Sequence, residues 1–196
     1  MGKKNRIKNN KKQKQKNESN KNTLVIAALF IVVLGYYGLN QLGGSDYPSM
    51  VSGVFYDKPL VAADTGKVTV PEEVLEANKM VFIDIKLENT TEEFTYLGRK
   101  ILLNSYRDAE YLPLVIIETP KGKTISGVRV CEPCSSFSFH IVDGKYLSCD
   151  ACGTRWDIET LQGISGGCMN YPPPRITTGL ANGIIIEAGQ TGLNLA

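Results

Sequence analysis

The chain has 196 residues, enough for one ordinary domain and a tail. Its formal net charge of +2 joins two unlike parts: residues 1–22 carry nine basic side chains and one acid, a net of +8 that leaves −6 for the rest. The single histidine, His140, excludes any site built from two imidazoles of this chain. The sequence also contains no Gly-rich phosphate-binding loop and no Ser–His–Asp set of the kind found in hydrolases.

An uncharged stretch, Thr23–Leu39, follows the basic run. As a helix its seventeen residues span about 25 Å, against roughly 30 Å of hydrocarbon in a bilayer. Basic residues before an apolar span keep the N-terminus in the cytoplasm. We therefore predict a basic cytoplasmic tail over 1–22, a single transmembrane helix over 23–41 and a linker over 42–54. We expect the tail to face lipid, with no nucleic acid as partner.

A cleaved signal peptide is the alternative to this anchor, although Gly43-Gly44-Ser45 is a poor cleavage site. Both interpretations place residues 46–196 outside the cytoplasm. We favour the anchor, which makes the chain a single-pass protein of the cell membrane with an extracytoplasmic C-terminal domain.

The remainder of the chain is predicted to be mainly β. Pro71–Asn78 has the proline and acidic first turn of a helix start. In Met80–Glu88, Val81, Ile83, Ile85 and Leu87 lie on one face and Asp84, Lys86 and Glu88 on the other, a period of two that predicts a strand. Further strands are expected at Leu114–Glu118, Gly127–Cys131 and Ile184–Glu187. We assign residues 55–127 to a β scaffold and residues 128–190 to a metal-binding, cysteine-rich lobe.

The lobe begins with a hairpin and two cysteine turns. Phe137–Ile141 and Lys145–Ser148 are separated by an Asp-Gly pair, a strong hairpin signal. A Cys-x-x-Cys turn lies on each side of this hairpin, and such turns aim two thiolates at one point. A fifth cysteine follows a Gly-Gly pair. The candidate ligands are Cys131, Cys134, Cys149, Cys152 and Cys168.

The cysteine pattern leaves the identity of the bound group open. Four thiolates suit zinc, a single iron or an iron–sulfur cluster about equally. Disulfides are the alternative outside the cytoplasm, but the odd count leaves one thiol over and Cys-x-x-Cys loops are too short to stabilise much. Cys168 is a fifth ligand, an exchange partner or a free thiol. We interpret His140 as an ordinary strand residue rather than a ligand.

The motifs resemble those of the FtrD-like family of membrane iron–sulfur proteins. The likeness covers roughly Val61 to Ile186 and includes the two Cys-x-x-Cys turns, the Asp-Gly turn between them and the Gly-Gly-Cys-x-Asn-x-Pro ending at Pro172. The resemblance implies an iron–sulfur cluster as cofactor. It also implies a setting in iron uptake or respiratory chemistry.

A more distant likeness is to the second ligand box of Rieske proteins, with Cys152 where they have histidine and Trp156 as a packing lid over the site. The expected fold is therefore a β-rich domain with a Rieske-like or zinc-ribbon-like Cys-x-x-Cys hairpin lobe. We expect an electron-transfer or metal-binding protein rather than an enzyme, with a membrane or extracytoplasmic redox or iron-transport partner. The alternatives are a structural zinc module in a binding domain and a thiol–disulfide carrier.

Overall fold

The computed structural model of the chain describes residues 47–196. The predicted tail (1–22), the predicted transmembrane helix (23–41) and the first part of the predicted linker (42–54) lie outside this range. Among residues 47–196, no helix combines the length and apolar character that a membrane crossing requires. These residues form one compact unit, and the predicted mainly β fold is confirmed for it.

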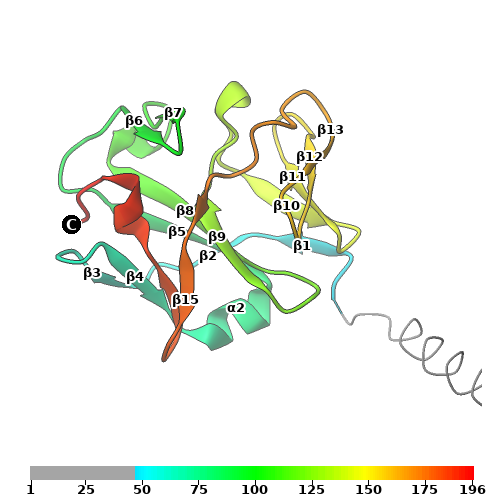
Figure 1. Ribbon diagram of the computed structural model, residues 1–196, viewed down its shortest axis with the longest axis horizontal. Coiled ribbons are helices and arrows are strands. Elements are labelled where there is room, and N and C mark those ends of the chain that lie inside the picture. Colours follow the sequence, from blue (N-terminus) through cyan, green and yellow to red (C-terminus); the bar gives the residue numbers. More distant parts are fainter. Residues whose placement is uncertain (1–46) are drawn as a thin grey trace, which may run out of the picture. The chain divides into compact units, whose positions relative to one another are not determined.

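A five-stranded central sheet runs through the unit (Figure 1). The long strands β5 and β8 pair antiparallel over seven residues, and β2 lies parallel to β5. The predicted strands at 80–88 and 114–118 are both found here, although β8 begins earlier than predicted. In order across the sheet, its strands are β14 (Arg175–Ile176), β9 (Thr124–Val128), β8 (Tyr111–Glu118), β5 (Met80–Lys86) and β2 (Val54–Phe55).

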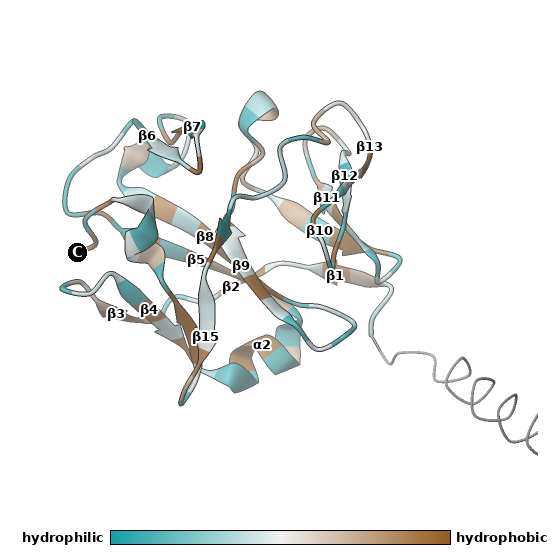
Figure 2. Cartoon of the chain, viewed as in Figure 1, coloured by the Kyte–Doolittle hydropathy of each residue, from teal (hydrophilic) through white to brown (hydrophobic). Residues whose placement is uncertain are grey.

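Both faces of the central sheet are covered, which explains why its strands are apolar almost throughout. Successive side chains of a strand point to opposite faces. One face enters a scaffold core, to which β5 and β8 contribute Val81, Ile83, Ile85, Leu112, Leu114 and Ile116. The other face enters a lobe core, to which they contribute Met80, Phe82, Val115 and Ile117. In Figure 2 the brown, hydrophobic stretches accordingly follow the strands.

One helix, a four-stranded sheet and a two-stranded hairpin cover the scaffold core on the side away from the central sheet's lobe face. Helix α2 (Glu72–Asn78) packs a single fully buried side chain, Leu75, against this core, and its C-cap residue Lys79 is left-handed with φ 61°. The predicted helix is thus confirmed. A four-stranded sheet and a hairpin complete the group: β15 (Thr178–Leu180), β16 (Ile184–Ile186), β4 (Lys67–Val70) and β3 (Leu60–Ala62), then β6 (Glu93–Tyr96) with β7 (Arg99–Leu102).

The second five-stranded sheet contains Cys149. Its central hairpin, β10 (Phe139–Val142) and β11 (Tyr146–Cys149), turns at Asp143-Gly144, where both residues have positive φ (56° and 58°) and the Lys145 N–H donates to the Val142 carbonyl at 3.1 Å. The Asp-Gly hairpin is therefore confirmed. The strand order is β1 (Met50–Ser52), β10, β11, β12 (Arg155–Asp157) and β13 (Gly163–Ser165).

Strand pairing crosses the predicted segment boundaries at two places. Strand β1, in the range predicted as a linker, pairs with β10 because Val51 is buried in the lobe core. Residues 175–186 fall in the range predicted for the lobe (128–190), but β14 pairs with β9 and β16 pairs with β4 of the scaffold. Both strands carry isoleucines that enter the scaffold core, and this burial decides their position.

Candidate metal centre

The first Cys-x-x-Cys turn is closed by its own backbone. Cys131 and Ser136 form an isolated antiparallel bridge, with the Cys131 N–H donating to the Ser136 carbonyl at 2.8 Å. Between them Glu132–Cys134 make one 3₁₀ turn with a proline inside it, and Ser135 is left-handed with φ 50°. The loop therefore presents Cys131 and Cys134 from one tight turn.

The second Cys-x-x-Cys turn starts at the end of β11. Cys149 pairs with Phe139 of β10, and the chain reverses so that the Gly153 N–H donates to the Cys149 carbonyl at 2.9 Å. Gly153 has φ 65°, a conformation that favours glycine. The backbone N–H groups of Cys152 and Ala151 also act to lower the pKa of the Cys149 thiol.

Thr154 ties the second turn to the loop of the fifth cysteine. It is fully buried, and its carbonyl accepts the Cys149 N–H at 3.0 Å. Its hydroxyl lies 3.3 Å from the Cys152 sulfur and accepts the Cys168 N–H at 3.1 Å. Gly166 passes so close that an added Cβ would lie 2.5 Å from this hydroxyl. Thr154 thus sets the relative positions of three cysteines.

Four of the five predicted cysteines form one group that could hold a metal, and the fifth, Cys149, lies next to it. The sulfurs of Cys131, Cys134, Cys152 and Cys168 all lie within 4.8 Å of one another, and the Cys149 sulfur is 3.6 Å from that of Cys134. In a tetrahedral site with metal–sulfur bonds of about 2.3 Å, neighbouring sulfurs are about 3.8 Å apart. The thiols are all free. The two turns and the third loop therefore form a sulfur group that could hold a metal.

Hydrogen bonds between the thiols give them different pKa values. A hydrogen bond from Cys131 lowers the pKa of Cys149 to about 4 although burial opposes the shift. The same hydrogen bond, with burial, raises the pKa of Cys131 far above its usual range, and burial raises that of Cys134 to about 12. Because a metal ligand must be a thiolate, metal binding to these cysteines would release protons.

Aromatic side chains share the lobe core with three of the cysteines. Trp156 is fully buried in this core, and its indole N–H donates to the Met169 carbonyl at 3.0 Å. The ring centroid of Phe139 lies 6.3 Å from that of Trp156. Trp156 is therefore a packing residue beside the site, with the bond to Met169 fixing the loop after Cys168. Cys152, in contrast, is exposed to solvent.

His140 lies in β10, as predicted, and is not part of the sulfur group. Its ring Nδ1 pairs with Asp150, whose carboxylate also accepts the Ser138 hydroxyl. Because Asp150 lies between Cys149 and Cys152, these contacts support the second turn from the surface of the lobe.

Two arginines that the motif spacing does not indicate hold the first turn in place. Arg99 of β7 forms an ion pair with Glu132 and donates to the Pro172 carbonyl at 2.8 Å, so it connects the first turn to the loop after Cys168. Arg129, two residues before Cys131, is almost completely buried. A charged residue in the apolar segment before the first ligand is the one signal that could have indicated it.

Comparisons with known proteins agree with the motif analysis. The family model described as membrane iron-sulfur containing protein FtrD-like matches residues 99–191. No curated protein matches the chain. A chain from a solved structure, described as a complex of reduced oxygenase and oxidized ferredoxin in carbazole 1,9a-dioxygenase, aligns with 12% identity and a TM-score of 0.33 over 55% of this chain and 93% of that one. A TM-score this low carries no argument.

The match to the family model begins at Arg99 and includes all five cysteines, so the resemblance that the cysteine motifs predict is confirmed: the segment 99–191 is matched by the FtrD-like family of membrane iron–sulfur proteins.

Proposed function

We propose that this chain is an electron-transfer protein with an iron–sulfur centre. The observation that carries the proposal is the convergence of four cysteine sulfurs from three separate loops, with the sulfur of Cys149 3.6 Å from that of Cys134. Thiolates are the ligands that iron–sulfur clusters require, and the matching family is described as iron–sulfur containing. Cys131, Cys134, Cys149, Cys152 and Cys168 would hold the group, which supplies one-electron chemistry when bound.

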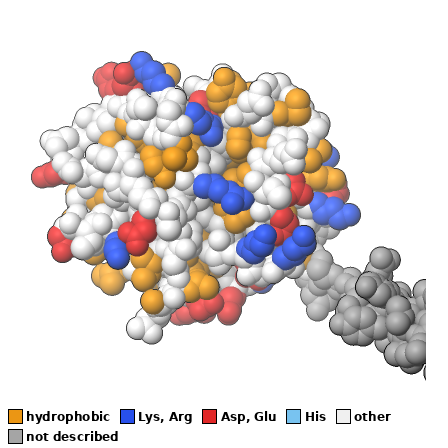
Figure 3. Space-filling view, in the orientation of Figure 1, with side chains coloured by type: hydrophobic (Ala, Val, Ile, Leu, Met, Phe, Trp, Pro, Cys, Tyr) orange, Lys and Arg blue, Asp and Glu red, His pale blue; other side chains and the backbone are white. Residues whose placement is uncertain are grey.

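The environment of the sulfurs suits electron transfer from one side. Trp156 and Phe139 are buried in the lobe core together with three of the cysteines. Cys152 is exposed, so a redox partner could approach the centre at this cysteine. In Figure 3, Lys and Arg side chains lie from the centre to the lower right of the face shown, with Asp and Glu side chains among them.

The proposed setting is the outer surface of the cell membrane. The segment 23–41 would anchor the chain, with its basic tail in the cytoplasm and the described domain outside. Such a tether raises the concentration of the centre near membrane partners. We propose a membrane or extracytoplasmic partner in iron uptake or respiration. The family's description as membrane proteins supports this setting.

A structural zinc site is the second candidate. Sulfurs within 4.8 Å of one another form a compact group, which also fits the tetrahedron around one ion. In that case the metal would stabilise the lobe without redox chemistry. The remaining alternative, a thiol–disulfide carrier, would use the 3.6 Å approach of Cys134 and Cys149.

Anaerobic purification of the full chain, followed by metal analysis, visible absorption and EPR, tests the proposal. We expect iron and acid-labile sulfide, visible absorption that dithionite bleaches, and an EPR signal in one of the two redox states. The Cys168→Ser variant should lose most of the visible absorption if Cys168 is a ligand. Colourless protein with one zinc per chain would establish the zinc alternative. Metal-free protein with a reversible disulfide would establish the carrier.

A further inference from the structure

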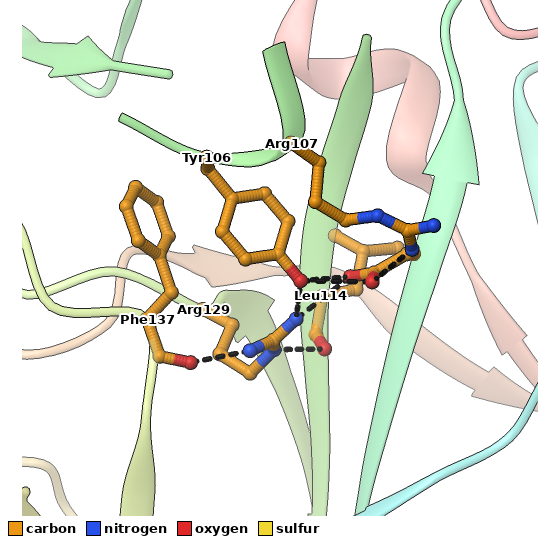
Figure 4. Close-up of polar contacts among 6 residues, drawn as sticks. Tyr106, Arg107, Leu114, Arg129 and Phe137 are labelled. Carbon is orange, nitrogen blue, oxygen red and sulfur yellow. Dashed lines mark hydrogen bonds and ion pairs between the residues drawn. The ribbon is translucent and has the colours of Figure 1, made fainter. Parts of the chain in front are cut away.

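Arg129 connects the central sheet to the first cysteine turn. Its side chain is 2% exposed, and its guanidinium makes hydrogen bonds in several directions (Figure 4). On the scaffold side it donates to the Leu114 carbonyl at 3.3 Å, to the Asp84 carboxylate at 2.7 Å and to the Tyr106 hydroxyl. It also donates to the carbonyl of Phe137, the first residue after the Cys131–Ser136 bridge. One buried cation therefore joins the central sheet to the end of the first cysteine turn.

The contact with Phe137 fixes the end of the metal-binding loop. Phe137 directly follows Ser136, which is bridged to Cys131, so the turn with both cysteines lies between Arg129 and Phe137. The start of this segment is fixed as well, because the Arg129 N–H donates to the Pro113 carbonyl of β8 at 2.9 Å. Arg129 thus holds the turn at both ends against the central sheet.

The network around Arg129 carries a net positive charge. Asp84 is 7% exposed and forms ion pairs with both Arg129 and Arg107, each at 2.7 Å. Two guanidinium groups and one carboxylate leave one positive charge, and Arg129 is the guanidinium shielded from water, because Arg107 is half exposed. Arg129 also lies over aromatic rings, 4.5 Å from the centroid of Phe82 and 5.0 Å from that of Phe55. In such apolar surroundings a charge is weakly screened and acts over a longer range than at the surface.

We propose that Arg129 is a positioning residue for the metal centre: its guanidinium holds the Cys131–Cys134 turn in the geometry that binds metal, and its charge raises the reduction potential of the centre. The second part rests on the proposed redox function, whereas the first requires only that the sulfur group binds a metal. Thiolate ligands make the centre anionic, and each added electron makes it more so. A positive charge two residues from Cys131, in surroundings that screen it weakly, therefore stabilises the reduced state.

Four variants of the full chain separate the two effects. Arg129→Met removes the tether and the charge, and Arg129→Lys keeps the charge without the forked set of donors. Arg107→Met is the matched control, because Arg107 shares Asp84 but is half exposed and makes no contact with the loop. The fourth variant combines Asp84→Leu with Arg129→Met. Replacing a buried ion pair with apolar residues of similar volume is often neutral for stability, so this variant should fold even if Arg129→Met does not.

Metal retention tests the tether. Each variant is loaded with Co(II), and the loss of the sulfur-to-cobalt absorption to excess chelator is timed. We expect loss on the order of 10–100-fold faster in Arg129→Met and in the double variant, since outer-shell partners of metal ligands commonly contribute this much. Arg129→Lys should be intermediate and Arg107→Met close to the unmodified chain. Equal rates for the double variant and Arg107→Met would overturn the inference.

Reduction potential tests the charge. In iron-loaded protein we expect Arg129→Met to lower the potential, Arg129→Lys to preserve it and Asp84→Asn to raise it. A purely structural role would move the potentials of Arg129→Met and Asp84→Asn in the same direction, because both variants damage the same network, and would contradict the charge effect. Failure of the unmodified chain to bind Co(II) or iron would overturn the proposed function and, with it, this inference. Metal binding that none of the variants changes would overturn the inference alone.

Discussion

Two adjacent glycines precede Cys168, and the fold requires only the first. Gly166 has φ 103°, and an added Cβ would lie 2.5 Å from the hydroxyl and 2.6 Å from the Cα of Thr154. Gly167 has an ordinary φ, and a Cβ there would meet no atom within 4 Å. The close approach at Gly166 is what allows Thr154 to bond to the Cys168 N–H.

Alanine at these two positions should therefore have different effects. We expect Gly166→Ala to lower the free energy of unfolding by about 1–3 kcal/mol, because it combines a left-handed φ with a backbone clash, and to displace Cys168. Gly167→Ala should change it by less than about 0.5 kcal/mol. Denaturant titration and metal content check both variants. Equal metal content in the two would show that Cys168 needs no fixed position.

At the scale of elements, the long strands could be predicted from the sequence and the short strands could not. The apolar face of Met80–Glu88 with its period of two and the Asp-Gly turn between β10 and β11 are local signals, and both identify their elements. Strands of two or three residues, such as β1 and β2, carry too few residues for a period to be recognised. They are strands because a distant strand offers its edge, which no local pattern encodes.

The same limit applies within the site. The cysteines could be brought together from the sequence, because each Cys-x-x-Cys turn is local and one hairpin separates the two. The contacts of Arg129 could not, since its bonding partners Asp84, Tyr106 and Leu114 are 45, 23 and 15 residues away in the chain. Only folding of the central sheet makes them neighbours. Its supporting role is therefore visible in the structure alone.

Strand β1 offers a direct test of its part in the lobe. Val51 is buried in the lobe core, whereas its neighbour Met50 is 62% exposed. We expect Val51→Asp to lower the free energy of unfolding by about 2–3 kcal/mol, because it buries a charge without a partner. Met50→Asp, on the opposite face of the same strand, should cost less than about 0.5 kcal/mol. Fluorescence of Trp156, which lies in the same core, reports the transition; matching midpoints would mean that β1 does not pack as described.

At the scale of the whole molecule, the two cores differ in their dependence on the site. Cys131, Cys149 and Cys168 are themselves members of the lobe core, whereas the scaffold core contains no cysteine. The central sheet contributes side chains to both. Loss of metal would thus act first on the lobe and reach the scaffold only through β5 and β8.

Removal of the metal should accordingly loosen one side of the molecule. In amide hydrogen exchange of the chelator-treated protein, we expect the hairpin β10–β11 to lose at least about tenfold in protection, equivalent to about 1.4 kcal/mol. Amides shared by β5 and β8 should change much less, because their scaffold face stays packed. Restoring the metal should restore the protection. A uniform loss over all sheets would instead mean that the molecule unfolds as one cooperative unit, with the sulfur group stabilising the scaffold as much as the lobe.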